Sequence, residues 1–129
     1  MRVVRVYTGD DNESHFEDLE IPLNESRYGR LSDLVPVEGV MFRETPSGGE
    51  LDYHNAPRRQ FVITMTGVVE VECWDGSKRR LGPGGILLAE DTTGRGHITR
   101  EIEGPRTSLF LPLPDDFDPA TWRVASQGA

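Results

Sequence analysis

Two histidines stand in the two most polar stretches of the central chain, and their side chains can do chemistry. His54 lies within residues 53–60, and His97 ends the stretch formed by residues 90–97. Imidazole binds zinc, iron, nickel, copper and manganese, and it also accepts or donates a proton near neutral pH. We therefore take His54 and His97 as candidate catalytic residues, either of which could act as a general base if no metal binds.

Three arginines accompany these histidines. Arg58 and Arg59 directly follow Pro57, and Arg95 comes two residues before His97. A guanidinium group at the mouth of a pocket would suit a carboxylate or a phosphate on a substrate. The alternative is that these side chains are solvent-exposed loop charges, or form ion pairs with the acidic surface of the protein itself. We carry Arg58, Arg59 and Arg95 as candidate substrate-binding residues.

Two threonines complete the candidate substrate-binding set. Alternate residues of a strand point to the same face. By this rule Thr64 shares a face with Gln60, and Thr99 shares a face with His97. We expect the hydroxyl groups of Thr64 and Thr99 to line the same pocket as the histidines.

Short strands must position these residues. Runs rich in Val, Ile, Leu, Phe and Thr, separated by glycine and proline, predict strands. These runs cover residues 2–7, 40–45, 60–66, 68–73, 85–89, 97–102 and 107–111. Residues 60–66 and 68–73 are expected to form a hairpin that turns at Gly67, and residues 74–77 contain an Asp-Gly turn. Residues 24–34 and 118–122 are the two short stretches that could be helical.

Composition sets the class of protein. The 129 residues suit one domain, and the 14 Gly and 9 Pro suit many turns. The net charge of −8 argues against nucleic acid and against an anionic membrane surface as partners. The apolar runs are too short to cross a bilayer, the single cysteine excludes an internal disulfide framework, and the N-terminus lacks an apolar signal-peptide region. We expect a soluble, cytoplasmic protein.

The spacing of the central residues resembles the first motif of the cupin family. That motif places Gly, His, a second His, Glu and Gly at fixed intervals. Here the corresponding positions hold Gly48, His54, Ala56, Gln60 and Gly67, so the spacing is kept while two of the three ligand types differ.

The second cupin motif has a counterpart further along the chain. Residues 94–97 fit its Gly-x-x-His ending, and residues 82–88 resemble its Pro-Gly-Asp-Val turn into the next strand, with Gly85 in place of Asp. The interval from Gly85 to His97 is one residue longer than the family pattern, Thr92 replaces a proline, and Glu101 replaces an asparagine.

The resemblance implies an all-β fold, an antiparallel double-sheet jelly-roll barrel over residues 1–129 as a single domain. It also implies a strand arm at residues 1–8 that could pair with a neighbour in a homodimer, and a Pro/Asp-rich tail at residues 112–129. In the family, three histidines and a carboxylate hold a metal. The matching ligands here would be His54, Gln60 and His97, around zinc, iron, nickel or manganese, with Asp52, Glu50 or Glu101 as alternative sources of the missing carboxylate.

The implied function is the binding of a small organic molecule, expected to carry a carboxylate, inside the barrel. As a metal-dependent enzyme the protein would be an oxygenase, an isomerase, a decarboxylase or a cyclase, with the metal polarising a carbonyl or enolate. Two alternatives stand beside the enzyme: a metal-free module that binds or senses a small ligand, and a structural homodimer with a vestigial pocket.

Overall fold

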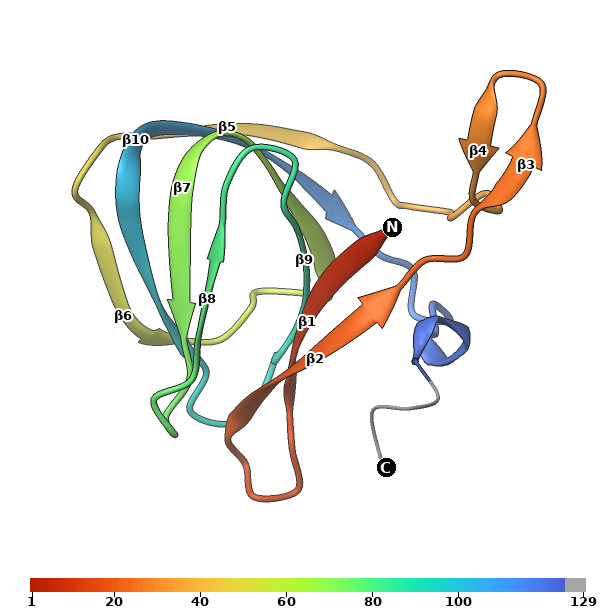
Figure 1. The fold of residues 1–129 in the computed structure, drawn as a ribbon. Coiled ribbons are helices and arrows are strands. Elements are labelled where there is room, and N and C mark those ends of the chain that lie inside the picture. Colours follow the sequence, from red (N-terminus) through yellow and green to blue (C-terminus); the bar gives the residue numbers. More distant parts are fainter. Residues whose placement is uncertain (125–129) are drawn as a thin grey trace.

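The computed structural model describes residues 1–124, and these residues are almost entirely β-sheet (Figure 1). The all-β expectation is confirmed. The strands are β1 (Arg2–Thr8), β2 (Ser14–Glu20), β3 (Asn24–Ser26), β4 (Gly29–Leu31), β5 (Met41–Thr45), β6 (Glu50–His54), β7 (Gln60–Glu72), β8 (Lys78–Leu81), β9 (Ile86–Glu90) and β10 (His97–Pro112), and they are followed by the 3-10 turn η1 (Ala120–Trp122).

Eight of the strands form one mixed sheet in the order β2-β1-β9-β7-β10-β5, in which β6 also pairs with β10 and β8 also pairs with β7. Figure 1 shows that this sheet bends strongly, with β5, β6 and β10 on one side of the molecule and β1 and β2 crossing on the other.

The expectation of a wholly antiparallel sheet is wrong at one pairing. Val4–Tyr7 of β1 run parallel to Leu87–Glu90 of β9, while the other strand pairs described are antiparallel. Parallel neighbours need a long crossover connection, and the chain between β2 and β9 supplies it. Because β2 pairs along the other edge of β1, this segment is an internal strand of the sheet rather than an arm free to join a neighbour.

The hairpin expected at Gly67 is also wrong, because residues 60–66 and 68–73 lie in one continuous strand, β7. Gly67 has a φ of +82°, and a Cβ atom there would lie 2.6 Å from the carbonyl oxygen of Glu103 on β10. The β7–β10 register shifts beside this contact, so glycine allows a bulge and a close approach instead of a chain reversal. The predicted turn at residues 74–77 is confirmed: the Cys73 amide donates to the carbonyl of Ser77, and β8 follows.

The two stretches that could be helical differ in outcome. Residues 24–34 contain the small, fully exposed hairpin of β3 and β4, so the helical alternative is wrong there. At residues 118–122 a short helical turn is confirmed, where Asp118 Oδ1 accepts a hydrogen bond from the Ala120 amide. The expected tail at residues 112–129 is described as far as residue 124, and residues 125–129 lie outside the described part.

Two apolar clusters cover the two faces of the sheet. Alternate residues of β9 point to opposite faces, and Leu87 accordingly joins a cluster with Val6 and Val71, while Leu88 joins another with Leu19 and Trp122. Burial on both faces explains why β9 is a continuous apolar run in the sequence. Across residues 1–124 we find no helix with the length and apolar character needed to span a membrane.

Candidate functional site

A cavity of about 480 Å³ is lined mainly by residues of the large sheet. This volume suits a small organic molecule. The residues that line it come mainly from β5, β6, β7, β9 and β10: Arg43, Thr45, Gly49, Glu50, Leu51, His54, Ala56, Pro57, Gln60, Val62, Ala89, His97, Thr99, Glu101, Arg106 and Phe110.

The two candidate catalytic histidines meet in this cavity. His54 ends β6 and His97 begins β10, and the two residues are partners in the antiparallel register. Their ring centroids are 4.5 Å apart, with the ring planes inclined at 59°. The pairing of two strands distant in sequence therefore brings two imidazoles to one wall of the cavity.

A buried carboxylate holds His97. The Nδ1 atom of His97 lies 2.5 Å from Asp91 Oδ2, and the Ser14 hydroxyl donates to the same oxygen at 2.7 Å. Asp91 is fully buried, and His97 is 4% exposed. Because an ionised carboxylate only accepts hydrogen bonds, Nδ1 carries the proton and Nε2 is the nitrogen left for the cavity. Asp91 and Ser14 were missed by the sequence analysis, although Asp91 lies in the same polar stretch as His97.

His54 is held more simply. Its Nδ1 atom donates to the backbone carbonyl of Asp52 at 2.9 Å, which leaves Nε2 as the free ring nitrogen. Partial burial, helped by the neighbouring His97, holds the pKa of His54 below its usual value. His54 is therefore a neutral partner for His97 at neutral pH.

Of the remaining candidate site residues on β7 and β10, Gln60 and Thr99 line the cavity and Thr64 does not. Gln60 is buried and lines the cavity, but its Oε1 atom accepts a hydrogen bond from Arg58 Nη1 at 3.2 Å. Thr99 lines the cavity as expected. Thr64 is 1% exposed and is not part of the cavity lining, which corrects the expectation for this residue. Its amide donates a hydrogen bond to the carbonyl of Gly85, in the turn before β9.

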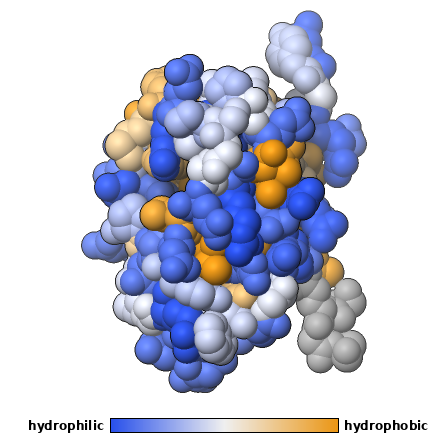
Figure 2. All heavy atoms as spheres, turned by 90° about the vertical axis from the view of Figure 1, so that its left-hand side faces the viewer, coloured by the Kyte–Doolittle hydropathy of each residue, from blue (hydrophilic) through white to orange (hydrophobic). Residues whose placement is uncertain are grey.

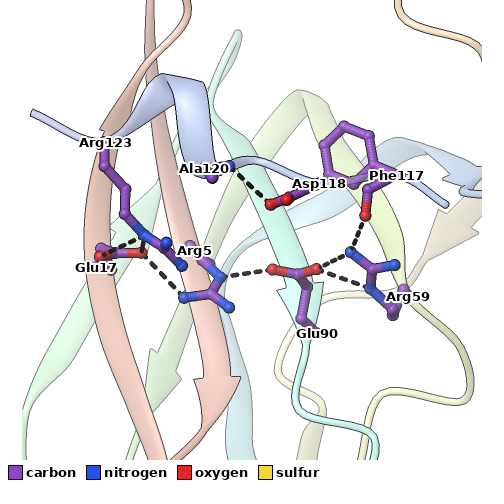
Figure 3. A network of polar contacts seen from close by, with 8 residues as sticks. All are labelled: Arg5, Glu17, Arg59, Glu90, Phe117, Asp118, Ala120 and Arg123. Carbon is purple, nitrogen blue, oxygen red and sulfur yellow. Dashed lines mark hydrogen bonds and ion pairs between the residues drawn. The ribbon is translucent and has the colours of Figure 1, made fainter.

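The three arginines taken from the sequence lie outside the cavity lining. Arg59 forms a close ion pair with Glu90, which also receives a hydrogen bond from Arg5 Nε at 2.5 Å, as Figure 3 shows. Arg95 pairs with Glu13 at 3.0 Å and lies 3.6 Å above the ring of Trp74. For Arg59 and Arg95 the structure therefore favours the alternative of ion pairs with the protein's own acids.

Arg43 and Arg106 are the arginines that line the cavity, and neither was chosen from the sequence. Both come from the β5–β10 pair: Arg43 lies in a run that was predicted only as a strand, and Arg106 directly precedes another such run. Figure 2 shows the side of the molecule that carries β6, where apolar patches are separated by hydrophilic residues.

The donor set at the cavity does not fit a resident divalent metal. Within residues 1–124 no cluster contains three or more His, Cys, Asp or Glu side chains placed to hold one ion. Catalytic zinc sites use three protein ligands, and here only two imidazoles are free to serve.

The three acids considered as replacement ligands are engaged elsewhere. Glu101 is held by Arg106 through two hydrogen bonds, and Glu50 pairs with Arg100 at 3.2 Å. Asp52 accepts a hydrogen bond from the Tyr53 amide and is not part of the cavity lining.

Comparison with known proteins gives a fold likeness and no family. No protein-family profile matches the chain. No curated protein matches it either. Among solved structures, the chain is similar to a conserved protein of unknown function from Streptococcus pyogenes, with 16% identity and a TM-score of 0.44 over 74% of this chain and 96% of the other.

Proposed function

We propose that this chain is a small cupin-like jelly roll that binds a small organic molecule in its cavity and moves a proton on that molecule at His97. The observation that carries the proposal is the buried hydrogen bond between Asp91 and His97 at the cavity wall. A general base that is oriented by a carboxylate and faces a pocket is a recurrent arrangement for proton transfer.

The chemistry needs only the residues of the chain. His97 Nε2 would take a proton from a carbon next to a carbonyl group, and the electron pair left behind would form an enolate. Asp91 would stabilise the imidazolium through Nδ1, as its position at 2.5 Å from that atom allows. In a carbonyl compound with a β,γ double bond this electron pair is shared with the γ-carbon, and return of the proton to that carbon from His97 would complete an isomerisation, which consumes no oxidant or reductant. Among the reaction classes implied by the sequence, isomerisation is therefore the one we propose.

The jelly-roll assignment has support of its own. The sheet bends strongly and has apolar clusters on both faces (Figure 1). The strand carrying His54 and the strand carrying His97 pair side by side, as the spacing of the two cupin-like motifs would require.

Proton exchange with solvent tests this function without knowledge of the natural substrate. Purified protein would be incubated in D2O with a panel of small carbonyl compounds, both neutral and anionic, and loss of the proton signal next to the carbonyl followed by ¹H NMR. We expect the wild type to accelerate exchange for at least one compound. His97→Gln should abolish the acceleration, and Asp91→Asn should reduce it by roughly 10²-fold or more.

His15→Gln is the matched control, because His15 pairs with Asp11 and is absent from the cavity lining. Its exchange rate should equal that of the wild type. If compounds bind in the cavity and none exchanges, proton transfer is wrong, and the chain is better described as a metal-free binding module. Addition of zinc, iron, nickel or manganese to parallel samples shows whether a metal changes the rate.

A further inference from the structure

The end of the cavity formed by β5 and β10 contains a buried arginine with one unused donor. Arg106 is 5% exposed and lines the cavity. Its Nε and Nη2 atoms donate to the two carboxylate oxygens of Glu101 at 2.8 and 2.9 Å. Its Nη1 atom is buried and has no hydrogen-bond partner within residues 1–124.

A second unused donor, the hydroxyl group of Thr45, belongs to a neighbouring residue. Thr45 is the register partner of Arg106 across the β5–β10 pair, and it also lines the cavity. Its Oγ1 atom is likewise buried and has no partner among the described residues. Buried polar groups in native proteins are nearly always satisfied, by protein, by water or by a ligand. As register partners on neighbouring strands, Arg106 and Thr45 have their side chains on the same face of the sheet.

The charged residues that line the cavity indicate what kind of acceptor group the two unused donors would bind. Glu101 neutralises Arg106, and Glu50, the other acid in the lining, is paired with Arg100. Arg43 lies above the ring of Phe110, 5.5 Å from its centroid, and no acid among the described residues forms an ion pair with it. The lining therefore includes one exposed arginine, Arg43, that no described acid pairs with, together with two buried, unused donors.

We infer that Arg106 Nη1 and Thr45 Oγ1, with the charge of Arg43, form a subsite for the carboxylate of a small organic acid. Resting on the proposed function, this inference names the substrate class: the carboxylate would bind at the β5–β10 end while the rest of the molecule reaches His97. The lining between these ends includes Ala56, Val62 and Ala89, so the body of the acid is expected to be apolar.

The test compares an acid with neutral compounds of the same shape. Binding of sodium benzoate, benzamide and benzyl alcohol to the full chain would be measured by calorimetry and by ¹⁵N NMR of the arginine side chains. Acetate, succinate and pyruvate extend the panel of acids. We expect a carboxylate to bind at least roughly tenfold more tightly than its neutral counterpart, since a hydrogen bond to a charged acceptor is stronger than one to a neutral acceptor.

Thr45→Val removes one hydroxyl with little change of shape. It should weaken carboxylate binding by roughly tenfold and leave benzamide binding unchanged. Thr107→Val is the matched control, because the Thr107 hydroxyl bonds to Thr66 on an exposed part of the same sheet. Arg43→Gln should weaken carboxylate binding and reduce its dependence on salt, because it removes a positive charge that no described acid pairs with.

Arg106 needs a paired substitution, since Arg106→Gln alone would leave the buried Glu101 carboxylate unpartnered. The double variant Glu101→Gln and Arg106→Gln removes both charges and should abolish the preference for carboxylates. Arg80→Gln is its control, because Arg80 is an exposed arginine paired with Glu70. A well-dispersed NMR spectrum shows that each variant is folded. If the double variant does not fold, the binding results for Thr45→Val and Arg43→Gln decide whether the carboxylate subsite exists.

The outcomes separate this inference from the proposed function. The subsite is wrong if no carboxylate in the panel binds more tightly than its neutral counterpart, or if Thr45→Val and Arg43→Gln leave carboxylate binding unchanged. Carboxylate binding that depends on Thr45, without proton exchange in D2O, would keep the subsite and overturn the chemistry at His97. Proton exchange that occurs only in neutral compounds would support proton transfer at His97 and overturn the carboxylate subsite.

Discussion

The two histidines of the cavity differ because their Nδ1 atoms meet different acceptors. His97 is backed by the buried carboxylate of Asp91, whereas His54 is backed by a neutral backbone carbonyl. A carboxylate stabilises a charged imidazolium far better than a carbonyl does. This contrast is the reason for assigning proton transfer to His97 and a neutral, hydrogen-bonding role to His54.

The lowered pKa of His54 predicts a specific dependence of stability on pH. Because folding lowers this pKa, the unfolded chain takes up the proton more readily than the folded chain. His54 therefore reduces the free energy of unfolding as the pH falls below roughly 6.5, and it contributes nothing above that value. Urea unfolding at several pH values between 7 and 5 should show a steeper loss for the wild type than for His54→Gln. Equal slopes would contradict the assignment.

At the level of the residue, the sequence predicted the imidazoles and missed their surroundings. His54, Gln60 and His97 were found because a motif spacing marks positions along the chain. Asp91 and Arg106 were missed because their roles depend on contacts made only after folding, with Ser14 and Glu101. Ion pairs such as Arg59 with Glu90 join residues that the sequence alone gives no reason to bring together.

Among the elements, β7 and β10 are the strands whose length the sequence pattern predicted incorrectly. Glycine between two apolar runs is typical of a turn, and the same residue is needed where a long strand bends over a neighbour. Both β7 and β10 were therefore divided into two strands each. The Asp-Gly turn at residues 74–77 was predicted correctly because its sequence favours one local geometry, whatever the rest of the chain does.

Gly67 gives a prediction about β7. Gly67→Ala should lower the free energy of unfolding by about 3 kcal/mol, because it adds a steric clash with the Glu103 carbonyl to the strain of a positive φ. Gly76→Ala is the control: its φ of +86° is similar, and a Cβ there meets open space. This control should cost about 1 kcal/mol. Urea unfolding measures both values, and equal costs would show that the close approach is unimportant.

On the scale of the whole molecule, one buried carboxylate joins parts of the chain that are far apart in sequence. Glu90 on β9 binds Arg5 on β1 and Arg59 before β7, and Arg59 also donates to the Phe117 carbonyl at 2.7 Å (Figure 3). This network fixes the segment before η1 against the sheet. The homodimer expected from the sequence stays a prediction. Because β1 is already paired along both edges, it has no free edge to offer to a second copy.

The Glu90 network predicts that the loss of a buried acid lowers the free energy of unfolding more than the loss of an exposed one. The Glu90 side chain is 6% exposed, and it is the acid that pairs with Arg59, whereas Arg5 also pairs with Glu17. Glu90→Gln therefore leaves Arg59 without its counter-charge and should cost about 2 kcal/mol of unfolding free energy. Glu20→Gln, at an exposed carboxylate that pairs with the N-terminal amine, should change it by less than about 0.5 kcal/mol. Chemical denaturation in one buffer measures both. Similar losses in the two variants would contradict a buried network.

The parallel pairing of β1 with β9 has a consequence for how the chain folds while it is being synthesised. A ribosome releases β1 and β2 early, yet the inner edge of β1 finds its partner only when residues 87–90 have emerged. The β1–β2 hairpin must therefore wait with one edge open while most of the chain is synthesised. Such an open edge is a site for wrong pairing between nascent chains, and the charges that line this hairpin, Arg2, Arg5, Glu17 and Asp18, are well placed to discourage it.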